Sequence, residues 1–170
     1  LLGHPSAEVD RILHPVPGEV GDHEVGPLAR ADRHSDLGER VHQQVPLGLQ
    51  LGDAILYTRR LLRFAGEPAI LEDLWLPVAR FNGLTAERLM NYNGPMYALY
   101  EAEFSVHMVR AEEKIRAILP SPGEAQLLAV SPHTPVLSVE RIACSYGDTP
   151  MELRLGLYRT DTHYYHSALK

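Results

Sequence analysis

The feature of this sequence that most constrains its fold is a pair of strand–turn–strand patterns that repeat about 81 residues apart. The first spans Ala54–Leu76 around a turn at Ala65–Pro68, and the second spans Pro135–Arg159 around a turn at Tyr146–Pro150. Each turn contains a glycine and ends at a proline, and these residues mark chain reversals. The β-branched and aromatic residues of the arms favour extended backbone. Two hairpins related in this way predict one antiparallel sheet with pseudo-twofold character.

The segment between the hairpins predicts helices that pack on this sheet. Short helices are expected at Thr85–Met90, with the threonine as its cap, and at Pro95–Glu103, with the proline in its first turn. Ser105–Leu119 predicts a long strand that is bent or interrupted, and a third short helix follows at Pro122–Leu128. We therefore expect an α+β fold, in which helices pack on an antiparallel β-sheet.

Composition narrows the function classes. The formal net charge of -6 disfavours a surface that binds nucleic acid, because neutralising phosphates requires clustered Lys and Arg. Cys144 is the single cysteine, so neither an intrachain disulfide nor a metal site built on cysteine pairs is expected. The sequence contains no run of about 18 apolar residues, so we expect a cytoplasmic protein with no membrane partner.

Residues 1–45 differ in character from the remainder. They hold five of the nine histidines (His4, His14, His23, His34 and His42). These lie about ten residues apart, without the i, i+4 spacing that brings two ligands to one helix face, so we predict no metal site. We expect 1–45 to be a divergent or poorly structured segment with a short helix at Asp36–Val41, and 46–170 to be the folded domain.

Strand alternation places two charged side chains on faces that are otherwise mainly apolar. Arg60 lies on the same face of its strand as Leu62, and Glu72 lies on the same face of the next strand as Leu74. A charge among apolar neighbours costs free energy unless it is paired or meets a ligand. Two interpretations remain open for this pair, a ligand-binding site and a structural Arg–Glu bridge.

The last predicted strand extends the first of these interpretations. Glu152, Arg154 and Tyr158 share one face, which taken alone is typical of a solvated surface. In the register of the repeat, Arg154 corresponds to Glu72, so the polar set points to the side that carries Arg60. A pocket between sheet and helices, lined by apolar groups with a few convergent charges, suits a small polar ligand.

Catalytic patterns are weak by comparison. The sequence contains no Gly-x-Ser-x-Gly, no phosphate-cradling loop and no His-Glu-x-x-His. Glu112 and Glu113 would point to opposite faces of a strand and cannot form an acid–base pair. We therefore predict neither an enzyme nor a bound cofactor.

Eight short segments, in a fixed order within residues 46–166, carry a family resemblance: Gly52–Leu61, Gly66–Glu72, Leu76–Pro77, Pro95–Leu99, Val109–Glu112, Val139–Arg141, Pro150–Leu153 and Tyr158–Asp161. In residues and spacing they resemble the UTRA effector-binding domain, the C-terminal half of HutC-type regulators in the GntR family. The resemblance implies a chorismate-lyase-like fold that holds a small effector between sheet and helices. It also implies a homodimer in which effector binding alters the placement of attached winged-helix domains on DNA. Residues 1–45 match neither a winged helix nor the usual first strand of such a sensor.

The resemblance also implies site residues. Effector contacts in such domains correspond to Arg60, Glu72, Glu152 and Tyr158, with Tyr97 and then Arg110 as further candidates.

Two positions at which this sequence differs from the family pattern bear on the chemical class of the effector. Members that sense sugar phosphates often carry a second basic residue where this chain has Leu62, and a small hydroxyl residue where it has Gly94 and Pro95. Within a class of sugars, sugar derivatives, carboxylates and amines, the sequence therefore disfavours a phosphate and favours a carboxylate or a neutral polar molecule.

Three functions fit these observations. The family segments favour the sensing domain of a transcription regulator. The first alternative is a chorismate-lyase-like enzyme on the same fold, which would act on a small aromatic carboxylate through Arg60 and Glu152. The second is a structural dimerisation domain in which Arg60 and Glu72 form an internal bridge.

Overall fold

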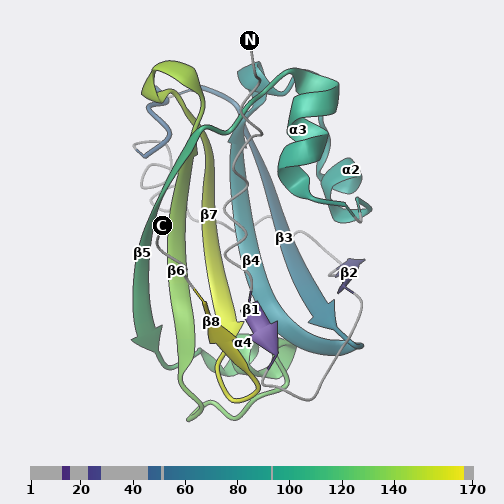
Figure 1. Cartoon of the computed structure of the whole chain (residues 1–170), viewed down its shortest axis with the longest axis vertical. Coiled ribbons are helices and arrows are strands. Elements are labelled where there is room, and N and C mark those ends of the chain that lie inside the picture. Colours follow the sequence, from purple (N-terminus) through teal and green to yellow (C-terminus); the bar gives the residue numbers. More distant parts are fainter. Residues whose placement is uncertain (1–12, 16–22, 28–45, 51, 93, 167–170) are drawn as a thin grey trace.

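The main architectural element is a six-stranded antiparallel sheet with the strand order β2-β3-β4-β7-β6-β5 (Figure 1). A computed structural model describes residues 13–15, 23–27, 46–50, 52–92 and 94–166. The six strands are β2 (His23–Pro27), β3 (Ile55–Phe64), β4 (Glu67–Pro77), β5 (Arg110–Ile118), β6 (Val136–Cys144) and β7 (Pro150–Arg159). A smaller sheet pairs β1 (Leu13–Pro15) with β8 (His163–Tyr165).

The two predicted hairpins are confirmed. β3 pairs with β4, and β6 pairs with β7, in each case antiparallel. The first turn reverses through Ala65 and Gly66, whose φ angles of 49° and 83° are left-handed, and the second contains Gly147 at φ 67°. Because β4 and β7 are neighbours at the centre of the sheet, the two hairpins lie side by side with their second strands in contact, as a pseudo-twofold arrangement requires.

Local capping explains the helices. α2 (Ala86–Met90) begins at Thr85, whose hydroxyl accepts a hydrogen bond from Arg88 N at 3.1 Å. α3 (Met96–Phe104) follows Pro95, and α4 (Pro122–Leu127) begins with a capping box between Ser121 and Glu124. These three predicted helices are confirmed. Two single 3₁₀ turns, η1 (Val78–Arg80) and η2 (Tyr146–Asp148), complete the described elements.

The long strand predicted from Ser105 is shorter than expected and starts only at Arg110. Ser105 ends α3 in a left-handed conformation at φ 55°, which turns the chain away from the helix axis. Val106 and Met108 then pack into the helix-covered core before the strand begins. The expected interruption is therefore a connector between α3 and β5.

The amino-terminal stretch contributes strands that the sequence did not predict. β1 pairs with β8, and β2 pairs with β3 at one edge of the main sheet. The helix expected at Asp36–Val41 lies outside the described residues.

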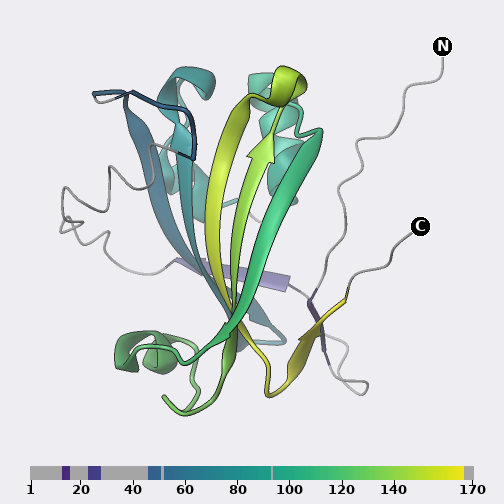
Figure 2. The same ribbon diagram turned by 90° about the vertical axis from the view of Figure 1, so that its left-hand side faces the viewer.

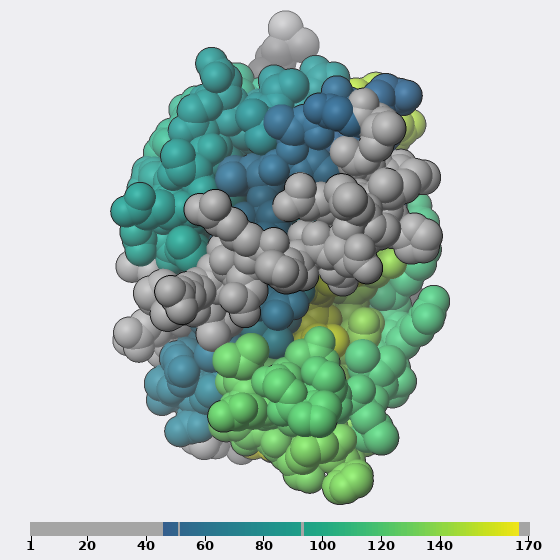
Figure 3. Space-filling view, turned by 180° about the vertical axis from the view of Figure 1, so that it is seen from behind, coloured from purple at the N-terminus to yellow at the C-terminus, as the bar shows by residue number. Residues whose placement is uncertain are grey.

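The sheet has two differently covered faces. α2 and α3 pack on one face at one end of the strands, and we call this the helix face (Figures 1 and 2). α4 packs on the opposite, outer face at the other end of the strands, where it and the following loop are green in Figure 3. The helix-face core contains Leu76, Phe81, Leu84, Leu89, Met96, Leu99, Tyr100, Val106, Met108, Ala143 and Met151. Among the described residues, no helix is long and apolar enough to cross a membrane.

The packing of α4 can be tested at Leu128, which is fully buried against Leu61, Leu71 and Val136. Leu128→Ala removes buried methyl groups and leaves a cavity, so we expect the free energy of unfolding to fall by about 2–5 kcal/mol. Chemical denaturation measures this change. Val78→Ala, at a side chain that is 37% exposed, is the control and should cost less than about 0.5 kcal/mol. Equal losses in the two variants would show that α4 contributes little to the core.

Candidate functional site

The pairing register of the strands places several charged residues on the helix face of the sheet. Residues that stand opposite one another in neighbouring antiparallel strands point to the same face. Arg60 of β3 stands opposite Glu72 of β4. Arg154 of β7 stands opposite Arg141 of β6, which in turn stands opposite Glu113 of β5. The charges therefore extend across the five strands from β3 to β5.

The first pair is deeply buried. Arg60 and Glu72 are 4% and 1% exposed. Arg60 Nε donates to Glu72 Oε1 at 2.7 Å, and Nη2 of the same guanidinium contacts the same oxygen. The other carboxylate oxygen, Oε2, accepts from Arg154 Nη1 at 3.3 Å. The internal bridge that the sequence left open is thus present, and it continues into β7.

Arg154 carries the network on to Glu152 and helix α3. Its Nε and Nη2 donate to the two oxygens of Glu152, each at 3.1 Å. Glu152 also accepts from the Tyr100 hydroxyl at 2.9 Å and from the Tyr97 hydroxyl at 3.3 Å. Four donors therefore saturate a carboxylate that is fully buried, and two of them attach α3 to the sheet.

A third pair lies toward the edge strand. Arg141 donates to Glu113 Oε1 from Nε at 2.7 Å and from Nη2 at 2.6 Å. Glu113 Oε2 accepts from the Tyr165 hydroxyl of β8 at 2.5 Å. We call the six charged residues Arg60, Glu72, Glu113, Arg141, Glu152 and Arg154 the ion network.

The network shifts proton affinities in a consistent direction. Burial alone would raise the pKa of Glu72, but the charges of Arg154 and Arg60 outweigh it and hold that pKa below its usual value. Burial, assisted by the negative charge of Glu152, raises the pKa of Tyr97 to about 12. At neutral pH Glu72 is therefore a carboxylate, and the Tyr97 phenol remains a proton donor.

Tyr158 lies in the same region, although it makes no ion pair. It stands opposite Ile70 of β4 on the helix face. Its ring folds back over Gly156, where an added Cβ would meet Tyr158 Cε2 at 2.4 Å. Burial and the nearby charge of Glu72 raise its pKa to about 12.

The structure brings most of the predicted site residues together. Arg60, Glu72, Tyr97, Glu152 and Tyr158 all lie at the ion network or beside it. Arg110 does not join them.

Arg110 stands opposite Cys144 on β6. It lies three positions before Glu113 in the same strand, so its side chain points to the outer face. There it is half exposed and pairs with Asp148 at 3.0 Å. Strand parity explains the difference, because Arg110 and Glu113 differ by an odd number of positions.

Three residues of this region were missed from the sequence. Arg141 matches Arg60 in the hairpin repeat, and that match could have revealed it. Tyr100 lies three residues after Tyr97, a spacing that puts both on one helix face. Glu113 could not be assigned a partner without the β5–β6 register.

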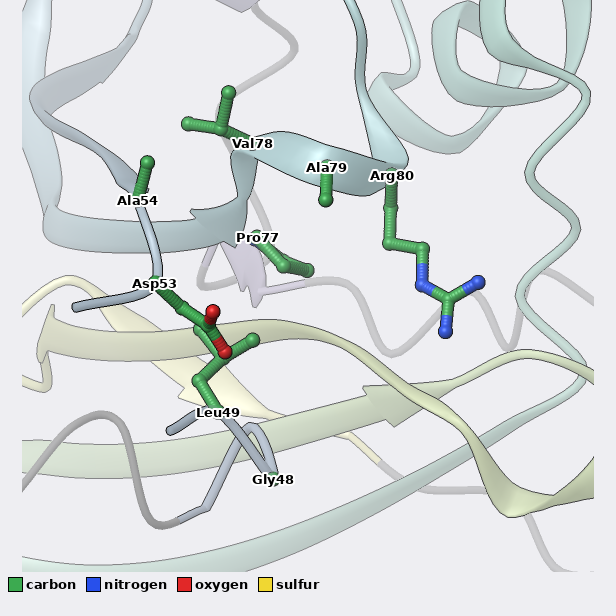
Figure 4. A pocket seen from close by; sticks show the side chains of 8 residues that line it. All are labelled: Gly48, Leu49, Asp53, Ala54, Pro77, Val78, Ala79 and Arg80. Carbon is green, nitrogen blue, oxygen red and sulfur yellow. The ribbon is translucent and has the colours of Figure 1, made fainter. Parts of the chain in front are cut away.

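A separate surface hollow of about 520 Å³ lies near the start of β3 and the end of β4 (Figure 4). It is lined by Gly48, Leu49, Asp53, Ala54, Pro77, Val78, Ala79 and Arg80 and contains no residue of the ion network. Within the described part of the chain, no group of three or more His, Cys, Asp or Glu side chains could hold a metal ion.

The sequence profile of the UTRA domain matches residues 38–164 of this chain. The chain belongs to the UTRA domain family. The resemblance inferred from the sequence segments is thereby confirmed, and so is the α+β fold with its antiparallel sheet.

Solved structures agree with this assignment. The UTRA domain is similar to the ligand-binding domain of a putative GntR-family transcriptional regulator from Bordetella bronchiseptica, with a TM-score of 0.77 and 41% identity over 93% of this chain and 96% of that one. It is also similar to the effector domain of PhnF from Mycobacterium smegmatis, with a TM-score of 0.72 and 25% identity over 87% and 88% of the two chains.

A curated relative shows how much of a regulator the match covers. The HTH-type transcriptional repressor PhnF of Mycolicibacterium smegmatis is 30% identical over 115 residues, which are 68% of this chain and 46% of that protein. The chain thus spans about half the length of the curated relative that it matches.

The ion network predicts a dependence of stability on pH. Because the folded-state pKa of Glu72 is depressed, its ionised form stabilises the fold fully above the ordinary pKa of 4.5, and this contribution is lost as the pH falls through the folded-state value. Glu72→Gln leaves the buried Arg60 without its carboxylate partner, so we expect the free energy of unfolding at neutral pH to fall by about 3–5 kcal/mol. The fall in stability below pH 4.5 should also become shallower.

Denaturation curves at several pH values measure both effects. Glu140→Gln, at an exposed carboxylate that pairs with Lys114, is the matched control and should change little. A Glu72→Gln protein as stable as the parent at neutral pH would contradict a stabilising role for the network.

Proposed function

We propose that this UTRA domain binds a small polar effector at the helix face of its sheet and so regulates DNA binding by an attached winged-helix domain. The observation that carries the proposal is the ion network, which places convergent polar groups between sheet and helix in a domain whose relatives are ligand-binding and effector domains of regulators. The effector belongs to the sugars, sugar derivatives, carboxylates or amines. The regulator acts in the cytoplasm, where bacterial DNA lies.

The state of the carboxylates supports a binding function rather than catalysis. A general acid or base works best with a pKa near the operating pH. The pKa of Glu72 is instead lowered, and Glu152 is saturated by Arg154, Tyr97 and Tyr100. No such observation favours the chorismate-lyase-like alternative, and the relatives described above are transcriptional regulators or domains of them.

Helix α3 could transmit effector binding to the attached DNA-binding domain by a change in its position on the sheet. Tyr97 and Tyr100 hold this helix on Glu152, so an effector that competes for Arg154 changes the strength of that attachment. Regulation requires only that the effector prefer one arrangement, typically by about 1–3 kcal/mol.

Effector binding is tested at Arg60, with Arg59 as a matched control. Both are arginines of β3 that make two contacts to a carboxylate of β4, but Arg59 pairs with Asp73 on the outer face. A thermal-shift screen of the four effector classes identifies a ligand, and calorimetry measures its affinity. Arg60→Met should weaken binding about tenfold or more, because a charge-assisted hydrogen bond is lost, whereas Arg59→Met should leave it unchanged.

Circular dichroism of both variants separates a binding defect from unfolding, and Arg60→Lys provides a more conservative change. A folded Arg60→Met protein that binds the ligand with the parent's affinity would overturn the placement of the site. If no compound of the four classes shifts the melting temperature, the sensing function loses its support.

We further propose that the domain forms a homodimer through the free edge of β5. β5 is the last strand in the sheet order, and no described strand pairs with its outer edge. Val109, Ile115 and Leu119, on or beside this strand, are 51%, 42% and 59% exposed. An edge that combines unpaired backbone groups with exposed apolar side chains is a template for pairing with another chain.

The charge pattern of β5 fits a second copy of the same strand. Glu112 and Arg116 lie on one face of β5, two positions on either side of Lys114. Antiparallel pairing centred on Lys114 therefore places Glu112 of each copy opposite Arg116 of the other. The lysine at the centre already pairs with Glu140 of its own chain at 2.8 Å.

A charge exchange tests this interface. Arg116→Glu should place like charges opposite one another at both symmetric positions and weaken the dimer at least about tenfold. Adding Glu112→Arg restores opposite charges and should restore the dimer. Sedimentation over a concentration series measures the dissociation constant, and Arg80→Glu, far from β5, is the control. A double variant that remains as weakly associated as the single one would exclude this register.

A further inference from the structure

At the centre of the helix face, the backbone of Gly156 is covered by the ring of Tyr158. Gly156 of β7 stands between Glu72 of β4 and Val139 of β6. It has no side chain, and the ring of Tyr158 occupies the space above it. The charged groups of the ion network lie around this ring.

Those charged groups are balanced. Arg60, Arg141 and Arg154 supply three positive charges, and Glu72, Glu113 and Glu152 supply three negative ones. Every member has at least one partner of opposite sign within the network. A ligand with a net charge would break this balance, because an anion adds an unmatched charge near Glu72 and Glu152 and a cation does the same near the arginines. In a buried site an unmatched charge is costly.

Hydroxyl groups, by contrast, have unused hydrogen-bonding capacity at this site. Thr58 of β3 is 3% exposed, and its Oγ1 has no hydrogen-bond partner among the described residues. It stands opposite Leu74, and Leu74 stands opposite Arg154, so it points to the same face as the network. The Tyr158 hydroxyl, whose pKa of about 12 keeps it protonated, is a second hydroxyl beside the network. A buried hydroxyl without a partner costs free energy, which a ligand that bonds to it would recover.

We infer that the effector of this site is an uncharged polyhydroxylated molecule, such as a sugar or sugar alcohol without phosphate, carboxylate or amine. Its hydroxyl groups bond to Thr58 and Tyr158, and its apolar ring or chain surface packs on the Tyr158 ring. This inference rests on the proposed function and narrows it to one ligand class.

Matched charge series on one scaffold test the inference. Glucose, galactose and glucitol are compared by calorimetry and thermal shift with glucose 6-phosphate, glucuronate and glucosamine, on the whole chain. We expect an uncharged member to bind at least tenfold more tightly than each charged member. Thr58→Val and Tyr158→Phe, which remove one hydroxyl each and keep the shape, should each weaken that binding at least fivefold. Tyr146→Phe, at an exposed tyrosine, is the control and should not change it.

The outcomes separate this inference from the proposed function. If a charged member binds most tightly and loses affinity in Arg60→Met, the inference is wrong and the proposed function stands. The same holds if no member of the series binds but a compound from the wider screen does. Unchanged affinity of the uncharged ligand in both Thr58→Val and Tyr158→Phe also overturns the inference. If nothing binds in either experiment, both fail.

Discussion

The interaction on which this structure depends is the arginine–carboxylate network buried on the helix face of the sheet. Arg154 connects the two buried carboxylates, because it donates hydrogen bonds to Glu72 on the neighbouring strand and to Glu152 on its own strand. Charges buried among apolar side chains are stable only with partners and hydrogen bonds in good geometry. Strand register, the choice of residues on each strand and the position of α3 must therefore agree with one another. A slip of one residue in any central strand would move its charge to the outer face.

The network also explains how elements that are distant in sequence hold together. Two tyrosines of α3 donate to Glu152, and Tyr165 of β8 donates to Glu113. The helix and the small sheet are thus attached to the same set of charges from different sides. The proposed effector site adjoins the first of these attachments, because Arg154 bonds to both Glu72 and Glu152, and the proposed dimer edge, β5, carries Glu113. A change in hydrogen bonding at the centre can therefore reach both the helix and the interface through few intermediate residues.

Much of this arrangement could be predicted from local signals. Turn residues and strand alternation gave the two hairpins, and the Thr85 and Pro95 signals gave the starts of two helices. Alternation together with the repeat also put Arg60, Glu72 and Arg154 on one side of the sheet. The remainder depends on relations between elements. The Arg141–Glu113 pair requires the β5–β6 register, and the strands at Leu13–Pro15 and His23–Pro27 form through pairing with distant partners.

A site whose charges are already matched suits a sensor better than one that waits for a ligand to neutralise it. Unpaired buried charges would destabilise the ligand-free domain, and its folding would then depend on bound effector. Internal pairing removes that dependence, and Glu72 and Arg154 remain ionised partners in the free state. The effector then needs to change only how hydrogen bonds are shared among groups that are already in place. The free energy of such an exchange is small, and coupling between two domain arrangements needs no more.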